Sequence, residues 1–387
     1  MTAGATGYDD SVLDDPGVLA RLDAGEMLRA VATAGAQVRE ALLHVEPAML
    51  EPVVADDRPR AVVVTGMGGS GIVAEVVAAV AGPACPVPVH VVRGYRLPGW
   101  VGPMDLVVAV SCSGETAETL SALDEAHRRG ARVVTVGARE SALTRRSQGS
   151  RSVHLPVDAK GRMPRANLWG LAVPVLLLLD ALGLLNAPRS LLDRVADDLD
   201  RVSERCGPAA DVAVNPAKAL ALQLAGSLPY VWGSSELAGV AAARFAAQLA
   251  ENAKYPAVPG TLTEVHHNQV VVMAGRFGAL GAGDDDIFRD RVEEGPPWPR
   301  MRVLVLRDTE EVPAVAQARE ATRVIGERYD VQVDELPAEG DHPLDRLASL
   351  VAPLDFASAY LALVQGIDPT PIEPIVALKK ATAKEHL

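Results

Sequence analysis

The chain has few cysteines, few aromatic residues and a shortage of positive charge. Three cysteines, Cys85, Cys112 and Cys206, lie far apart among 387 residues without a CxxC pair, so neither a disulfide framework nor a zinc knuckle is indicated. Aromatic residues make up only 4%, too few for a surface that stacks single-stranded bases. A net charge of −13 argues against nucleic acid or an anionic membrane as the main partner. Any anionic ligand should therefore be small and bound locally.

Targeting and membrane segments are not indicated either. The N-terminal residues are acidic and lack the cationic and apolar blocks of a signal peptide. The most apolar stretch, residues 168–185, contains Gly170, Pro174 and Asp180 and is only just long enough to cross a bilayer. We predict a buried core helix there, and we expect a cytoplasmic protein.

The order of apolar runs predicts two α/β domains, residues 1–187 and 188–387. The length favours two domains, and the first begins with a helical extension over residues 16–45. Strands alternating with helices indicate two doubly wound domains, each with a parallel sheet flanked by helices. An acidic, Gly- and Pro-rich stretch at residues 281–297 is expected to be an exposed insertion. The predicted strands are residues 61–65, 87–92, 106–110 and 132–136 in the first domain, and 229–232, 270–274, 302–306 and 331–336 in the second.

A glycine-rich loop follows the first predicted strand. Gly66, Gly68 and Gly71 satisfy GxGxxG between a strand and a helix, a pattern found in dinucleotide-binding proteins. The next strand ends at Arg93-Gly94 and lacks the acidic residue that would hold a ribose, so a nicotinamide dehydrogenase is a weak alternative. Glycines that only permit a tight turn are a further interpretation of this loop alone.

A second loop, rich in hydroxyl groups, follows the strand at residues 106–110. Ser111, Ser113 and Thr116 surround Gly114 at the start of a helix, where free N–H groups and the helix dipole favour an anion. N-capping would explain one hydroxyl but not three. Together the two loops suit a single phosphate group better than an extended pyrophosphate.

The two loops resemble those of the sugar isomerase (SIS) domain family, whose members bind phosphosugars. Most of the chain is similar to the bifunctional phosphoglucose/phosphomannose isomerases within that family. The similarity is carried by short strings in the same order: Pro164-Arg165-Ala166, Glu251-Asn252-Ala253-Lys254, His267-Asn268, Leu306-Arg307-Asp308, Asp368-Pro369-Thr370-Pro371 and Leu378-Lys379.

The resemblance implies an aldose-ketose isomerase that interconverts glucose 6-phosphate or mannose 6-phosphate with fructose 6-phosphate through a cis-enediol. It implies a homodimer and neither a cofactor nor a metal ion. Arg165 would stabilise the enediolate, Glu251 would move the proton, His267 from the partner subunit would assist ring opening, and Lys379 would contact the ring oxygen or a hydroxyl. The phosphate-binding residues would be Gly69, Ser70, Ser111, Ser113 and Thr116.

Two residues depart from the family pattern, and they support an alternative. Glu115 stands where the family usually has Asn, and it would repel a phosphate unless it points away. Gln269 stands where Glu usually follows His-Asn. A phosphosugar sensor without catalysis is therefore the second hypothesis. The sequence also leaves Lys379 and Lys380 hard to separate, because neighbours on a helix lie about 100° apart.

Overall fold

The structure, a computed structural model, describes residues 8, 10–148, 152–281 and 298–383. The chain divides into two compact units built from non-consecutive segments. Unit 1 comprises residues 1–29, 203–339 and 350–387, and unit 2 comprises residues 30–202 and 340–349. The division at residues 187 and 188 stays a prediction.

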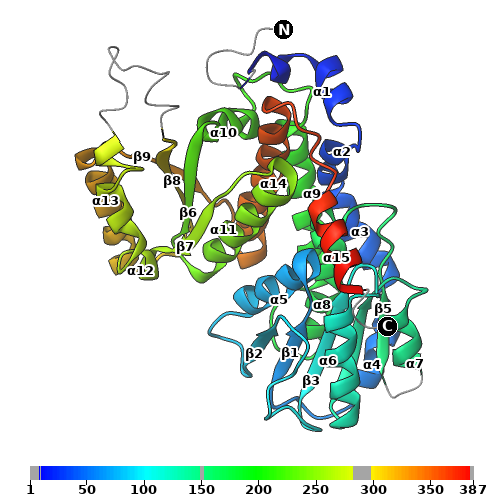
Figure 1. Ribbon diagram of the computed structural model, residues 1–387. Coiled ribbons are helices and arrows are strands. Elements are labelled where there is room, and N and C mark those ends of the chain that lie inside the picture. Colours follow the sequence, from blue (N-terminus) through cyan, green and yellow to red (C-terminus); the bar gives the residue numbers. More distant parts are fainter. Residues whose placement is uncertain (1–7, 9, 149–151, 282–297, 384–387) are drawn as a thin grey trace, which may run out of the picture. The chain divides into compact units, whose positions relative to one another are not determined.

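Unit 2 contains a five-stranded parallel sheet with the strand order β2-β1-β3-β4-β5. Every residue of β1 and β3 is buried, which explains their continuous runs of valine, since a central parallel strand is covered on both faces. Helices flank this sheet (Figure 1). The strands are β1 Val62–Thr65, β2 Val89–Val92, β3 Leu106–Ser111, β4 Arg132–Gly137 and β5 Val153–Pro156.

The helices of unit 2 include the predicted core helix. In α8, all residues from Leu168 to Leu179 are buried, so the prediction of a core helix at the most apolar stretch is confirmed. The helices that lie wholly or mainly in this unit are α3 Ala34–His44, α4 Pro47–Val54, α5 Gly68–Ala81, α6 Ala117–Arg128, α7 Ala142–Gln148, η2 Pro164–Ala166, α8 Leu168–Ala181 and α9 Arg189–Cys206.

Unit 1 contains a four-stranded parallel sheet with the order β7-β6-β8-β9. Figure 1 shows α12 and α13 on one side of this sheet and α11 and α14 on the other. The strands are β6 Ser227–Gly233, β7 Val258–Thr261, β8 Arg300–Arg307 and β9 Gln332–Pro337. The helices are η1 Asp10–Asp14, α1 Pro16–Leu22, α2 Met27–Ala32, α10 Pro216–Leu224, α11 Glu236–Gln248, η3 Leu249–Ala253, α12 Leu262–Val265, η4 Gln269–Ala274, α13 Pro313–Arg328, α14 Pro343–Val364 and α15 Glu373–Ala383.

The two sheets repeat one topology. In each, the first strand of the unit lies between the second and the third. The predicted pair of doubly wound α/β folds is therefore confirmed. In such a sheet, chain connections leave the first and third strands in opposite directions, and ligands bind at this switch point, outside the carboxyl ends of the strands.

Two secondary-structure predictions are wrong. The helix predicted over residues 16–45 is three helices, because the Asp23 carboxylate accepts hydrogen bonds from the N–H groups of Met27 and Leu28 and so starts a new helix. The strand predicted over residues 270–274 is the short helix η4. A short apolar run does not distinguish the two structures by periodicity, and Asn268 accepts a hydrogen bond from the Gln269 N–H at the start of η4.

The predicted insertion at residues 281–297 lies, apart from Gly281, outside the described residues. Among the helices that the structure describes, α14 is long and apolar enough to cross a membrane by length and composition, but 94% of its most apolar window is buried inside the protein. Such burial is typical of a core helix.

Candidate active site

The switch point of unit 2 brings the two predicted loops together. β1 and β3 are neighbours and pair in register up to Thr65 and Ala109, so the loops that follow them leave the same edge of the sheet. The N–H of Cys112 donates a hydrogen bond to the Ser70 hydroxyl at 3.0 Å. The glycine-rich and hydroxyl-rich loops are thus joined side by side where a parallel sheet binds its ligands.

The hydroxyl-rich loop is ordered by its own side chains. The Ser111 and Thr116 hydroxyls are 3.0 Å apart, and the Gly114 N–H donates to the Ser111 hydroxyl at 3.1 Å. Thr116 occupies the N-cap position of α6, but its side chain does not cap that helix. The first turn of α6 therefore keeps N–H groups that an anion can accept from. Ser113, in contrast, is exposed.

Gly69 and Arg165 are in contact through the backbone. A Cβ atom at Gly69 would lie 2.7 Å from the Pro164 carbonyl carbon and 2.8 Å from the Arg165 nitrogen, closer than real Cβ contacts. Glycine is therefore needed here, and η2 packs directly against the start of α5. Arg165 is only 3% exposed, and its backbone lies beside the first loop.

Cys112 is a buried residue of the hydroxyl-rich loop. Its thiol is buried, and the Asn167 amide lies 3.8 Å from the sulfur. Burial raises the pKa of the Cys112 thiol, so the sulfur stays protonated and acts as a small apolar group.

The Glu115 carboxylate is directed from the hydroxyl-rich loop toward α7. Its carboxylate accepts a hydrogen bond from the Ala142 N–H, the first residue of α7, at 2.7 Å, and lies 3.8 Å from the Arg145 guanidinium. The negative charge is thus directed to the start of a neighbouring helix, where it interacts favourably with the helix dipole. The repulsion expected from this departure is reduced by that geometry.

Glu251 lies in unit 1, in the wide turn η3 that ends α11. This turn is a π-helix, a rare conformation that is frequent at functional sites. Glu251 is partly exposed, and the Lys254 ammonium donates to its backbone carbonyl at 3.0 Å. The glutamate is therefore placed on a rigid but unusual backbone.

The two adjacent histidines differ in their surroundings. They lie at the end of α12 and in the turn after it. His266 is half-buried, and its Nε2 lies 2.8 Å from the Thr322 hydroxyl; burial lowers the pKa of this imidazole. His267 is exposed, so it is the accessible ring of the pair.

Gln269 has two hydrogen-bond partners that use both ends of its amide. Its oxygen accepts from the Trp232 indole N–H at 2.8 Å, and its nitrogen donates to the Pro259 carbonyl at 3.2 Å. These bonds link η4 to β6 and β7. A carboxylate could not donate the second bond, so glutamine suits this chain.

The structure does not separate the two candidate lysines. Lys379 and Lys380 both lie on α15 and both are exposed. Lys379 belongs to unit 1, like Glu251 and His267, whereas the glycine-rich loop, the hydroxyl-rich loop and Arg165 belong to unit 2.

The corresponding switch point of unit 1 is filled by protein groups. The Ser234 hydroxyl accepts from the Asp308 N–H at 2.8 Å, and the Ser235 hydroxyl donates to the Asp308 carboxylate at 2.7 Å. Ser235 also accepts from the Ala238 N–H and so caps α11. The loop after β6 thus has a turn and capping role. No local sequence pattern indicates these bonds, because Asp308 is more than 70 residues from both serines.

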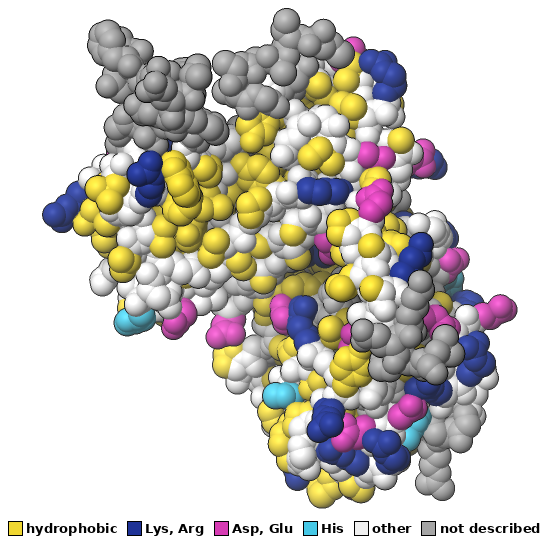
Figure 2. Space-filling view, viewed as in Figure 1, with side chains coloured by type: hydrophobic (Ala, Val, Ile, Leu, Met, Phe, Trp, Pro, Cys, Tyr) yellow, Lys and Arg dark blue, Asp and Glu magenta, His cyan; other side chains and the backbone are white. Residues whose placement is uncertain are grey.

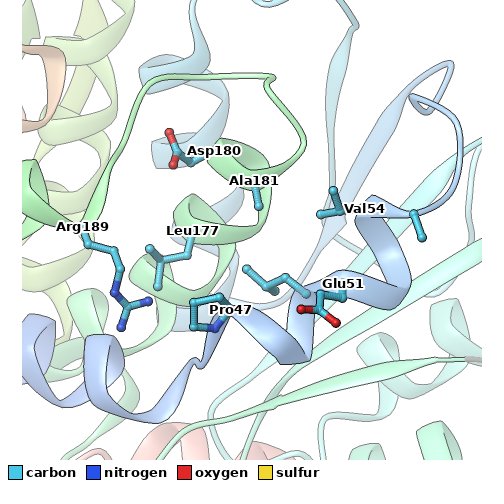
Figure 3. A pocket seen from close by; sticks show the side chains of 9 residues that line it. Pro47, Glu51, Val54, Leu177, Asp180, Ala181 and Arg189 are labelled. Carbon is cyan, nitrogen blue, oxygen red and sulfur yellow. The ribbon is translucent and has the colours of Figure 1, made fainter.

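A pocket of about 500 Å³ lies elsewhere in unit 2. Figure 3 shows Pro47 and Glu51 of α4 on one side and Leu177 and Ala181 of α8 on the other. None of the predicted site residues lines it. Most of its lining residues are apolar, with Glu51, Asp180 and Arg189 as the charged exceptions.

Comparison with known proteins shows the domain class of both units and the family of the whole chain. A SIS domain model matches residues 58–181, and a model described as the bacterial phospho-glucose isomerase C-terminal SIS domain matches residues 213–381. Both units are therefore of the SIS class. A bifunctional phosphoglucose/phosphomannose isomerase from Caldicellulosiruptor bescii is 31% identical over 86% of this chain and 92% of its own length.

Solved structures agree on the fold. A hypothetical protein from Thermus thermophilus superimposes with a TM-score of 0.70 and 16% identity, covering 98% of this chain and 97% of that one. Tagatose-6-phosphate ketose/aldose isomerase from Escherichia coli gives a TM-score of 0.65 at 15% identity, covering 91% and 97%. The chain belongs to the bifunctional phosphoglucose/phosphomannose isomerase family.

Proposed function

We propose that this protein is a sugar-phosphate isomerase that interconverts glucose 6-phosphate, mannose 6-phosphate or both with fructose 6-phosphate. The family relationship supports the class of reaction. The observation that carries the proposal is the bond between Ser70 and Cys112, which joins two anion-binding loops at one switch point with Arg165 beside them. This arrangement suits a single phosphate group.

The proposed mechanism proceeds through a cis-enediol without a metal ion. The hydroxyls of Ser70, Ser111, Ser113 and Thr116, together with the backbone at Gly69, hold the phosphate. Glu251 removes a proton from C2 of the aldose and returns it to C1, as a general base and then a general acid. Arg165 stabilises the negative oxygen of the enediolate.

Ring opening and sugar orientation are assigned to the remaining residues. His267 transfers a proton during ring opening, and Lys379 contacts the ring oxygen or a hydroxyl. The proposal includes a homodimer in which His267 reaches the partner's site, and a cytoplasmic location. In such a dimer, dilution should abolish activity before it unfolds the chain.

The assignment of Glu251 is tested by Glu251→Gln, which keeps the size of the side chain and removes its basicity. Turnover should fall by roughly 10² to 10⁴, the usual contribution of a general base. The measurement is a coupled assay with glucose 6-phosphate, mannose 6-phosphate and fructose 6-phosphate. Glu320→Gln, on an exposed turn of α13, is the matched control and should leave turnover unchanged. Near-normal turnover in Glu251→Gln would overturn the assignment.

A further inference from the structure

A row of buried polar side chains leads along α11 to Glu251. Arg244, Gln248 and Asn252 are spaced four residues apart, so they lie on one face of the helix. All three are buried, and Asn252 is fully so at 0% exposed. Burying three polar side chains costs free energy unless each is hydrogen-bonded. Whether this burial is tolerated therefore depends on the hydrogen-bond partners of the three side chains.

The partners are on the apolar helix α14. The Arg244 guanidinium donates to both oxygens of Asp355, at 3.0 and 2.6 Å, and the Gln248 amide donates to Asp355 at 3.0 Å. The Asn252 amide donates to the Ser358 hydroxyl at 2.9 Å. The Ser358 hydroxyl in turn donates to the Asp355 carbonyl at 2.7 Å. Three successive turns of α11 and η3 are thus fixed to one helix.

Glu251 lies in the wide turn η3, between Gln248 and Asn252, two of the side chains that are hydrogen-bonded to α14. The Lys254 N–H donates to the Leu249 carbonyl five residues back, so this turn contains more residues than the 3.6 of an α-helix. Each residue then turns through a smaller angle than the usual 100°. Asn252 can therefore keep facing α14, while Glu251 is rotated further from that face.

The far end of the turn is fixed as well. Lys254 has a positive φ of 53°, which ends the helix, and its ammonium donates to the carbonyls of Glu251 and Asn252 at 3.0 and 3.1 Å. The Gln365 amide donates to the Ala253 carbonyl at 3.1 Å. A rare backbone conformation persists only where its surroundings hold it, and here both ends are held.

We propose that Asn252, anchored by Ser358, is a positioning residue that maintains the π turn and so sets the orientation of the Glu251 carboxylate. The inference rests on the proposed function, in which Glu251 transfers the proton. Without the anchor, the turn relaxes toward an α-helix and the carboxylate rotates. A displacement of about 1 Å at a catalytic group can cost roughly 10² in rate.

The test uses Asn252→Ala and Ser358→Ala, which remove the two ends of the same hydrogen bond. Both should lower kcat by about 10- to 100-fold, with KM changed by less than about threefold, since the Asn252 side chain is fully buried and faces α14. Ser358→Ala is the milder variant and keeps the test available if Asn252→Ala folds poorly. Ser349→Ala is the matched control, because the Ser349 hydroxyl also bonds the carbonyl three residues back on α14; its kcat should be unchanged.

A double-mutant cycle separates positioning from general structural damage. In the Glu251→Gln background, adding Asn252→Ala should cause little further loss, because the side chain that Asn252 positions is already inactive. Additive losses, or normal kcat in both single variants, would overturn the positioning role while leaving Glu251 as the base. Full activity of Glu251→Gln alone would instead overturn the assignment of Glu251, and the proposed function itself would fail if the wild-type protein showed no isomerase activity.

Discussion

Glu115 illustrates at the scale of one residue how a departure from a family pattern can be accommodated. A carboxylate in a phosphate-binding loop should weaken anion binding if it faces the ligand. Here it accepts a hydrogen bond from the N–H of Ala142 and lies near Arg145. The side chain therefore ties the hydroxyl-rich loop to α7. Its two effects on phosphate binding, loop order and charge repulsion, have opposite signs.

Two substitutions distinguish these effects. Glu115→Ala removes the hydrogen-bond acceptor and should raise KM for the sugar phosphate about two- to tenfold, the usual range for one hydrogen bond. Glu115→Gln keeps an acceptor oxygen without the charge, so its KM should equal the wild-type value or lie below it. Steady-state kinetics with inorganic phosphate as competitor measures both. Tighter binding by the alanine variant would show that repulsion dominates.

At the scale of elements, α11 and α14 form the polar contact on which the Glu251 turn depends. Asp355 accepts from both Arg244 and Gln248 inside the mainly apolar helix α14. Removing one member of a buried ion pair leaves an uncompensated charge, whereas a solvent-exposed pair contributes little. The two kinds of pair should therefore respond differently to the same substitution.

Asp355→Asn should reduce the free energy of unfolding by about 3–5 kcal/mol, because the Arg244 guanidinium stays buried without a counter-charge. Glu320→Gln, which breaks the exposed pair with Arg323 on α13, should leave it nearly unchanged. Urea unfolding followed by circular dichroism gives both values. Equal effects of the two substitutions would contradict the structural role of Asp355.

Strand and helix positions follow from the sequence where burial imposes a simple pattern. The valine runs of β1 and β3 and the glycine and serine loops behind them are predicted correctly because central parallel strands are buried on both faces. Residues 270–274 fail because a short apolar run fits a strand or a helix equally well. Strands β5 and β7 are missed because their four residues include proline, and in β7 also glycine, and both residue types are depleted in strands.

The candidate site likewise has some features that the sequence predicts and others that it does not. Residue types at the ends of strands identify both phosphate loops, since every such loop leaves one edge of the sheet. The bonds between Ser70 and Cys112, and between Ser235 and Asp308, join residues 42 and 73 positions apart, and no local pattern contains them. The contacts of Asn252 with α14 are hidden for the same reason.

At the scale of the whole molecule, charge is organised locally. The net charge is −13, and on the face shown in Figure 2 the Lys and Arg side chains of unit 2 are interspersed with Asp and Glu. In the proposed function, phosphate binding therefore depends on helix N-termini, hydroxyls and Arg165 at the switch point of unit 2. Burial also affects titratable groups in both units. It lowers the pKa of four histidines, namely His127, His154, His266 and His342.

The lowered pKa values of these histidines predict that the free energy of unfolding falls in mild acid. Their pKa values are lower in the folded protein than the value near 6.5 expected in the unfolded chain, so the unfolded state binds more protons as the pH falls. Their contribution is fully present above pH 6.5 or so and is lost as the pH falls through the folded values. Burial raises the pKa of Asp23, so this carboxyl makes the free energy of unfolding change in the opposite direction. It is one group, whereas four histidines act in the other direction. Urea unfolding should show a lower free energy at pH 5.5 than at pH 7.5; an equal or higher value would contradict this account.

The central claim is that the protein moves a proton between C1 and C2 of a sugar phosphate. The most direct measurement is incubation of the wild-type protein with fructose 6-phosphate in deuterated water, followed by magnetic resonance of the products. We predict aldose 6-phosphate carrying deuterium at C2, because an acidic side chain that exchanges with solvent returns the proton. Binding of fructose 6-phosphate without any aldose product or exchange at C1 would contradict the isomerase and indicate a phosphosugar sensor.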